Sequence, residues 1–197
     1  MQAEILNTAN GIQLNGPLLL SPEVHRDERG FFFESWNQRR WEALLASYGQ
    51  EASAFVQDNH SSSSRGVLRG LHYQLPPYPQ GKLVRCVQGK IFDVAVDLRV
   101  ASPTFGQWVA AHLSDENHKL LWLPVGFAHG FLTLSTHAEV LYKATGFWSR
   151  DCERAIRWDD PRLAITWPEI VGFPKLSNKD EVSQLFLEAL TGEELFS

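Results

Sequence analysis

Residues 92–100, FDVAVDLRV, alternate strictly between two kinds of side chain, and this alternation constrains the fold more than any other stretch. One set is apolar and the other mainly polar: Phe92, Val94, Val96 and Leu98 against Asp93, Ala95, Asp97 and Arg99. A period of two residues is that of a β-strand, because successive side chains of a strand point to opposite faces. The stretch therefore predicts a half-buried strand.

Short runs of the same kind recur between glycine and proline residues. KLVRCVQGK (82–90) ends in Gln88-Gly89 just before the alternating stretch, so the two runs predict a hairpin with its turn near Gly89. Further strands are predicted at 31–36, 54–58, 66–74, 107–113, 119–123, 129–134 and 138–145. Many short strands separated by turns favour a single all-β domain over residues 1–197, a sandwich or barrel.

Helical periodicity is confined to short stretches, so the helices are expected to be peripheral. Residues 37–49 predict a helix, because Trp41, Leu44, Leu45 and Tyr48 fall on one side. Gly49 suits the C-terminal cap of this helix. The C-terminal tail, 177–197, is expected to hold a second short helix.

Composition limits the classes of partner. Hydrophobic residues make up 44% of the chain and charged residues 21%, the balance of a globular protein with a core. The net charge of -5 argues against nucleic acid as the main partner, because binding to a phosphate backbone needs a basic face. A small basic pocket for a phosphorylated ligand is still compatible with this charge.

The N-terminus and the cysteines indicate a cytoplasmic protein. The first residues lack a basic segment, and their apolar run is too short for a signal peptide or a membrane span. Cys86 and Cys152 are too few for a disulfide framework and too far apart for a zinc pair. No membrane partner is expected.

Two blocks of sequence place a histidine on a predicted strand. RGVLRGLHYQ (65–74) contains His72, and PVGFAHG (124–130) contains His129 after a Pro-x-Gly turn. These blocks resemble the two motifs of the cupin jelly roll, whose strands face one another inside a small barrel. Where metal-binding cupins have a second histidine and a glutamate, this chain has Gln74 and Lys82. An ammonium offers no lone pair to a metal, so no metal is expected and Lys82 is predicted to face an anion.

A more specific resemblance covers the chain from Arg26 to about Asp180. The segments RDERGFFFESW, VQDNHSSSSRGVLRGLHYQLPPYPQGKLVRCVQGKIFDVAVDLR, SPTFGQW, LWLPVGFAHGF, YKATGFW and WDDPRLAITWP follow one another in the order of a known family. Together they resemble the signature blocks of the dTDP-4-dehydrorhamnose 3,5-epimerases. The resemblance implies a cupin-type jelly-roll β-sandwich or barrel with a few short peripheral helices.

The resemblance also implies a chemistry that these residue types support. The family's substrate is a nucleotide-linked 4-keto-6-deoxy sugar, whose ketone acidifies the hydrogens at C3 and C5. His72 matches the family's proton acceptor and Tyr142 its proton donor, roles that suit an imidazole and a phenol at neutral pH. Lys82 matches the residue at the ketone oxygen, where one donor to an oxyanion contributes roughly 3–4 kcal/mol. Asp180 matches the carboxylate that orients the catalytic histidine.

Further positions match the family's substrate contacts. Arg69 and His129 match residues around the sugar and diphosphate, and Arg29 and Glu34 match residues at the nucleotide end. The remaining matches are polar contacts near the sugar and base or further substrate contacts: Gln57, Asn59, Glu153 and Lys179. Phe147 falls where the family often has tyrosine, so stacking on thymine is expected without a hydroxyl contact.

Strand geometry raises a conflict between Arg69 and His72. Residues three apart in a regular strand point to opposite faces, so both side chains could not enter one pocket. Gly70 lies between them and would allow a β-bulge that turns one side chain round. A bulge at Gly70 is therefore predicted.

The sequence is compatible with three alternatives to a metal-independent 3,5-epimerase. One is a related enzyme that inverts only C3 or only C5, and another is a non-catalytic cupin that binds a sugar nucleotide. A metal-dependent cupin dioxygenase is disfavoured by Gln74 and Lys82. The resemblance further implies a homodimer in which the N-terminal region, residues 1–36, packs on the partner subunit, and no cofactor.

Overall fold

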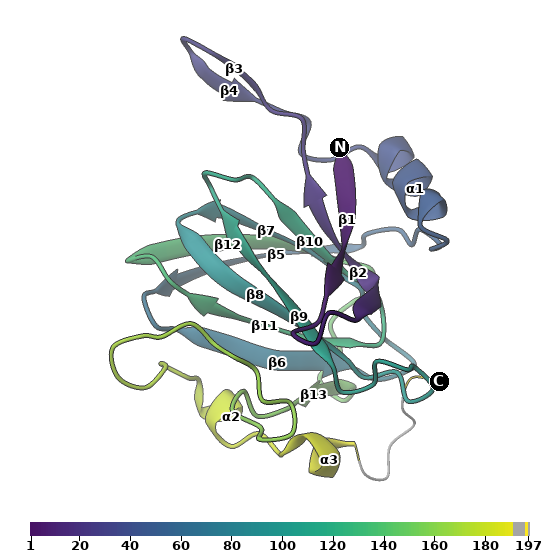
Figure 1. Cartoon of the computed structure of the whole chain (residues 1–197), viewed down its shortest axis with the longest axis vertical. Coiled ribbons are helices and arrows are strands. Elements are labelled where there is room, and N and C mark those ends of the chain that lie inside the picture. Colours follow the sequence, from purple (N-terminus) through teal and green to yellow (C-terminus); the bar gives the residue numbers. More distant parts are fainter. Residues whose placement is uncertain (191–195, 197) are drawn as a thin grey trace.

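The computed structural model describes residues 1–190 and 196, and most of its strands form two stacked sheets (Figure 1). The larger sheet has six strands in the order β1 (Gln2–Asn7), β2 (Gln13–Ser21), β10 (Leu120–Leu123), β7 (Lys82–Gln88), β12 (His137–Ala144) and β5 (Gln57–Ser64). The smaller sheet has five, in the order β13 (Glu153–Ala155), β6 (Leu68–Gln74), β11 (Phe127–Thr133), β8 (Lys90–Asp97) and β9 (Trp108–Ser114). Neighbours in both sheets pair antiparallel, which confirms the all-β sandwich predicted from the sequence.

The main core lies between the inner faces of the two sheets. Every second residue of β7 points into it, so that Val84 and Cys86 are buried there while Lys82 continues the same row at the strand's start. Facing residues come from the smaller sheet and include Ala95 and Phe131. An ammonium at the end of an apolar row needs a polar cavity beside it, and this is where the candidate site lies.

The prediction of a half-buried strand at 92–100 was wrong, because β8 is buried on both faces. Val94 and Val96 pack beneath the C-terminal segment, against residues such as Ile156 and Leu163. The more polar face points into the sandwich, and Asp93 on it is fully buried. The alternation is real, but it separates two buried environments rather than core from solvent.

The predicted hairpin at Gly89 was also wrong. β7 pairs with β10 and β12, whereas β8 pairs with β11 and β9, so the chain crosses from one sheet to the other at Gly89. Gly89 has a φ of 75°, and a Cβ on it would stand 2.1 Å from the carbonyl oxygen of His137. Gly89 therefore forms a corner between the two sheets. In the sequence such a corner looks like a hairpin turn, because both place a glycine between two strand-like runs.

The other strand predictions are close to the structure except at two places. β5 runs from Gln57 to Ser64 rather than over 54–58, because its serine-rich end pairs fully with β12. Of the predicted strand 31–36, only the first residues belong to a strand, β4 (Gly30–Phe32), which pairs with β3 (His25–Asp27). The β3–β4 hairpin projects from the sandwich as a separate arm (Figure 1), with Phe31 54% and Phe32 72% exposed.

The helices flank the sandwich. α1 (Gln38–Ser47) begins at Asn37, whose side chain accepts a hydrogen bond from the amide of Arg40, and it buries Trp41 and Leu45. The C-terminal segment carries α2 (Asn178–Glu181) and α3 (Phe186–Ala189), which run below β6 and β13 (Figure 1). Residues 191–195 and 197 of the predicted tail lie outside the described residues. No helix within the described residues is long and apolar enough to cross a membrane.

Candidate active site

A cavity of about 470 Å³ opens between the two sheets and is closed on one side by the C-terminal segment. It brings together a large part of the residues predicted from the sequence: Arg69, His72, Lys82, His129, Tyr142, Glu153 and Asp180. The smaller sheet provides the two histidines, and the larger sheet provides Lys82 and Tyr142. The titratable groups therefore approach the cavity from two opposite walls.

A bulge in β6 lets Arg69 and His72 reach this cavity together. His72 pairs with His129 and Arg69 with Phe131, so three steps along β6 match two along β11. Gly70 lies in the bulge with a φ of 126°, and a Cβ on it would stand 2.5 Å from Gly130 Cα. The predicted bulge at Gly70 is confirmed, and only glycine fits there.

His72 forms a dyad with Asp180. Its Nε2 donates to Asp180 Oδ1 at 2.5 Å, and the Ser177 hydroxyl donates to the other carboxylate oxygen at 2.9 Å. Burial pushes the pKa of Asp180 upwards, but the bonds from His72 and Ser177 outweigh burial and hold it below its ordinary value. A charged Asp180 fixes the tautomer of His72, so that Nδ1 carries the lone pair needed in a base.

A second histidine–carboxylate pair lies beside the first and was missed from the sequence. His129 Nε2 donates at 2.7 Å to Asp93 Oδ1, and Asp93 is fully buried. The other carboxylate oxygen of Asp93 has no hydrogen-bond partner among the described residues. The alternation of β8 gave Asp93 a place on the polar face, but only the sandwich shows that this face looks at His129.

Lys82 presents an ammonium to the cavity with no direct partner. It makes no ion pair or side-chain hydrogen bond with any residue of the described part of the chain. Burial lowers the pKa of Lys82 to about 8, although the charges of Glu153 and Asp93 partly oppose this. A half-buried cation without a counter-ion is a ready site for an oxyanion.

Tyr142 lies on β12 in the wall opposite His72. Its neighbours across the sheet are Asn59 and Val84, and its ring centroid is 6.5 Å from that of His129. Burial raises the pKa of Tyr142 even though Arg69 is near enough to oppose the shift. The phenol thus stays protonated at neutral pH and can only serve as an acid there.

Charged residues surround the cavity. Arg69 donates to Ser63 Oγ and to the carbonyl of Ser62, both at 3.1 Å, which fixes its guanidinium against the end of β5. Lys179 pairs with Glu153 at 2.6 Å. Burial acts to raise the pKa of Glu153, but its bond to Lys179 outweighs this and keeps the carboxylate charged.

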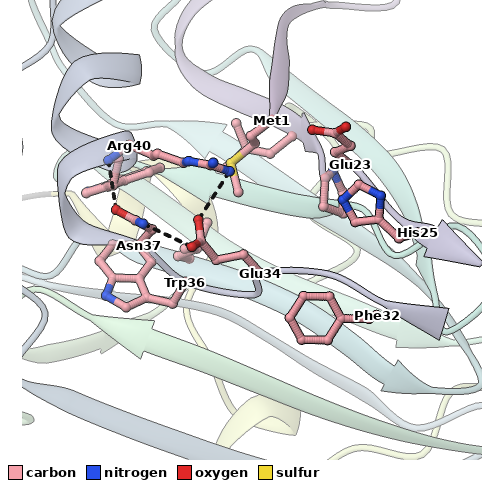
Figure 2. A pocket seen from close by; sticks show the side chains of 12 residues that line it. Met1, Glu23, His25, Phe32, Glu34, Trp36, Asn37 and Arg40 are labelled. Carbon is pink, nitrogen blue, oxygen red and sulfur yellow. Dashed lines mark hydrogen bonds and ion pairs between the residues drawn. The ribbon is translucent and has the colours of Figure 1, made fainter.

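The remaining predicted residues lie outside the cavity. Gln57 Nε2 donates to Asn59 Oδ1 at 3.0 Å, and Asn59 borders a neighbouring hollow beside Tyr142. Arg29 lies on the projecting arm, paired with Asp27. Glu34 lines a different pocket, where it accepts a hydrogen bond from Asn37 and pairs with Arg40 at 3.3 Å (Figure 2). A single chain does not bring Arg29 or Glu34 to the cavity.

Within residues 1–190 and 196, no group of three or more His, Cys, Asp or Glu side chains has the arrangement of a metal site. Gln74, at the cupin ligand position, instead bonds to three backbone groups of neighbouring loops.

An acid and a base on facing walls, with an unpaired ammonium beside them, suit proton transfer at an activated carbon. This is the chemistry of an isomerase that inverts a carbon centre. The cupin-type sandwich supplies the two walls.

Comparison with known proteins assigns the family. Residues 11–188 match the family model described as dTDP-4-dehydrorhamnose 3,5-epimerase. Proteins of that name from Shigella flexneri and Pseudomonas aeruginosa are each 56% identical over 172 residues, which is 87% of this chain and 92% of theirs. The chain belongs to the dTDP-4-dehydrorhamnose 3,5-epimerase family of carbohydrate epimerases, as its sequence blocks predicted.

A solved structure shows the same fold. The crystal structure of a dTDP-6-deoxy-D-glucose-3,5-epimerase from Legionella pneumophila, in complex with dTDP-4-keto-L-rhamnose, superposes with a TM-score of 0.84. The two proteins are 46% identical, and the match covers 93% of each chain. The cupin-type prediction is thereby confirmed.

Proposed function

We propose that this chain epimerises C3 and C5 of dTDP-4-dehydro-6-deoxy-D-glucose to give dTDP-4-dehydro-L-rhamnose, in the biosynthesis of dTDP-L-rhamnose. One observation carries the proposal: His72 and Tyr142 approach the same cavity from opposite sheets, with the Lys82 ammonium beside them. Inversion requires removal of a proton from one face of a carbon and return of a proton to the other. The Legionella relative binds a sugar nucleotide of this type.

In the proposed mechanism, His72 Nδ1 removes the proton from the carbon next to the ketone. The electron pair of the broken C–H bond moves onto the ketone oxygen, and the enolate that results lies against Lys82. Tyr142 then protonates the opposite face of the carbon. Solvent returns a proton to Tyr142 and takes one from His72, so the enzyme is restored.

Asp180 and Asp93 have supporting roles in this proposal. Asp180 keeps His72 in the basic tautomer, as the hydrogen bond at 2.5 Å indicates. Asp93 holds His129 and adds a negative charge that favours the protonated form of Lys82. No redox cofactor is expected, because proton transfer at an activated carbon involves no transfer of electrons to an acceptor.

We further propose a cytoplasmic homodimer in which the arm completes the partner's site. The exposed rings of Phe31 and Phe32 on β3–β4 favour burial against a second chain. Arg29 lies on the same arm, remote from its own cavity, and Glu34 follows just after it. As the family resemblance implies, Arg29 and Glu34 would then contact the nucleotide end of the ligand bound to the partner.

Product analysis in heavy water tests the proposed activity. Proton NMR of the product should show inverted configuration and solvent deuterium at both C3 and C5. Deuterium at only one of these carbons would identify a single-centre epimerase instead. Binding of the substrate without any exchange would identify a non-catalytic sugar-nucleotide-binding protein.

A further inference from the structure

Gln74 lies two residues beyond His72 on β6, is 3% exposed, and uses its whole amide group on the protein backbone. Its Nε2 donates to the carbonyl of Tyr78 at 2.6 Å and to the carbonyl of Phe147 at 3.1 Å. Its Oε1 accepts from the amide of Ser149 at 2.7 Å. Since an amide has two donor hydrogens, both are used, and the partners fix its orientation.

The segment 147–149 is held between Gln74 and Gln57. Gln74 binds the carbonyl of Phe147 and the amide of Ser149, and between them the amide of Trp148 donates to Gln57 Oε1 at 2.9 Å. Consecutive backbone groups of an irregular segment are thus satisfied by side chains from two sheets, in place of strand pairing. Loss of either glutamine would leave backbone groups of this segment without their partners.

The held segment presents two aromatic rings to solvent. Phe147 is 64% exposed and Trp148 55%, although aromatic rings of this size are usually covered. The segment is also joined to the cavity, because the backbone amide of Glu153, a residue that lines the cavity, donates to the carbonyl of Ser149 at 3.0 Å. Rigid, exposed rings next to a ligand cavity suit stacking against a flat heterocycle.

We propose that Gln74 is a positioning residue: it fixes the shape of segment 147–149, the platform on which the resemblance already places the thymine base, against Phe147. The proposal rests on the proposed function, because that function supplies the nucleotide. Gln74 would act on binding through the platform and leave the acid–base groups in place. In this respect the residue at a cupin ligand position serves ligand recognition rather than metal binding.

The test compares Gln74→Met with Gln50→Met. Methionine keeps the length of the side chain and removes its hydrogen bonds. Gln50 is a matched control, because it donates to the carbonyl of Gly16 at 2.8 Å and accepts from Trp122 at 2.9 Å, away from the cavity. Calorimetry measures the Kd for dTDP and for inorganic diphosphate, which lacks the base, and turnover assays give kcat and KM.

Gln74→Met should raise the Kd for dTDP and the KM about tenfold, and lower kcat by less than about threefold. Its Kd for inorganic diphosphate should change less than about twofold, as should every constant of Gln50→Met. Equal weakening of dTDP and diphosphate, or an unchanged Kd for dTDP, would overturn the proposal. If Gln74→Met does not fold, Gln74→Glu replaces it, since that variant keeps the acceptor for Ser149 and loses the two donated bonds.

A double-mutant cycle with Phe147→Ala shows whether Gln74 acts through the platform. The effect of Gln74→Met on the Kd for dTDP should largely disappear in the Phe147→Ala background. Additive effects would contradict action through the platform. Because dTDP binding is measured without turnover, a wild-type protein that binds dTDP but does not epimerise would sink the proposed function alone.

Discussion

At the scale of single residues, the protonation of Lys82 decides the pH range over which an ammonium faces the cavity. Its pKa is about 8 in the free protein because burial disfavours the charged form. An enolate oxygen needs the protonated form, so kcat/KM should fall as pH rises through about 8. A pH profile of kcat/KM checks this, because that ratio reports the groups of the free enzyme.

A conservative variant shows whether Lys82 causes this fall of kcat/KM at high pH, the basic limb of the profile. In Lys82→Arg the cation stays charged throughout the range, so whatever activity remains should lose the limb near pH 8. A wild-type limb that begins only above about pH 9.5, nearer the ordinary lysine value, would contradict the assignment.

Asp93 offers a second prediction at this scale. Asp93→Asn removes a buried negative charge that favours protonated Lys82, so the basic limb should move to lower pH. Because His129 also loses its charged partner, kcat should fall by about tenfold or more. Asp58→Asn is the control, since Asp58 pairs at 2.9 Å with Lys143 outside the cavity. A limb that does not move in Asp93→Asn would separate Asp93 from Lys82.

At the scale of the elements, the bulge in β6 places the base and Arg69 together. Gly70→Ala would set a Cβ 2.5 Å from Gly130 Cα, at a φ that alanine disfavours. We expect a loss of about 2–4 kcal/mol in the free energy of unfolding and a larger loss of activity. Urea denaturation and turnover of the folded fraction measure the two effects.

Gly172→Ala is the matched control for this bulge. Gly172 has a φ of 81°, but a Cβ there would meet nothing within 4 Å. The control should cost only about 1 kcal/mol, the penalty of the left-handed backbone alone. Equal losses in both variants would mean that the contact between β6 and β11 does not decide the outcome.

The elements also show what the sequence could and could not predict. Alternation located β7, β8 and β9 closely, because strand period is a local property. It could not assign faces, since both sides of β8 are covered by segments far away in the chain. Nor could it separate the corner at Gly89 from a hairpin, because both need a positive φ.

The residues of the site show the same limit: those matched by resemblance were predicted, and those defined by distant partners were not. His72, Tyr142, Lys82 and Asp180 were predicted by resemblance, and the fold brings them to one cavity. Asp93 and Gln74 were not given roles, because their roles depend on partners in other strands and loops: His129 for Asp93, and backbone groups of 78 and 147–149 for Gln74.

At the scale of the whole molecule, the proposed dimer predicts complementation between two inactive variants. One chain carries His72→Ala, and the other carries Arg29→Ala together with Glu34→Gln. If the arm serves the partner, each mixed dimer has one intact site. Random mixing should restore about a quarter of wild-type activity after co-expression of equal amounts.

Separately purified and unmixed variants provide the control for complementation. Each should stay near its own low rate at any concentration. Failure of the co-expressed pair to exceed those rates, although mixed dimers are isolated with two affinity tags, would place Arg29 and Glu34 with their own chain's cavity.

Deuterium exchange in two variants tests the central claim, that His72 is the base and Tyr142 the acid on the opposite face. Proton NMR follows the recovered sugar nucleotide in heavy water. His72→Ala should show no exchange at C3 or C5, because no enolate forms. Tyr142→Phe should continue to exchange with retained configuration, because the enolate can collapse back through His72. Persistent exchange in folded His72→Ala, or equal loss of exchange in both folded variants, would contradict the account.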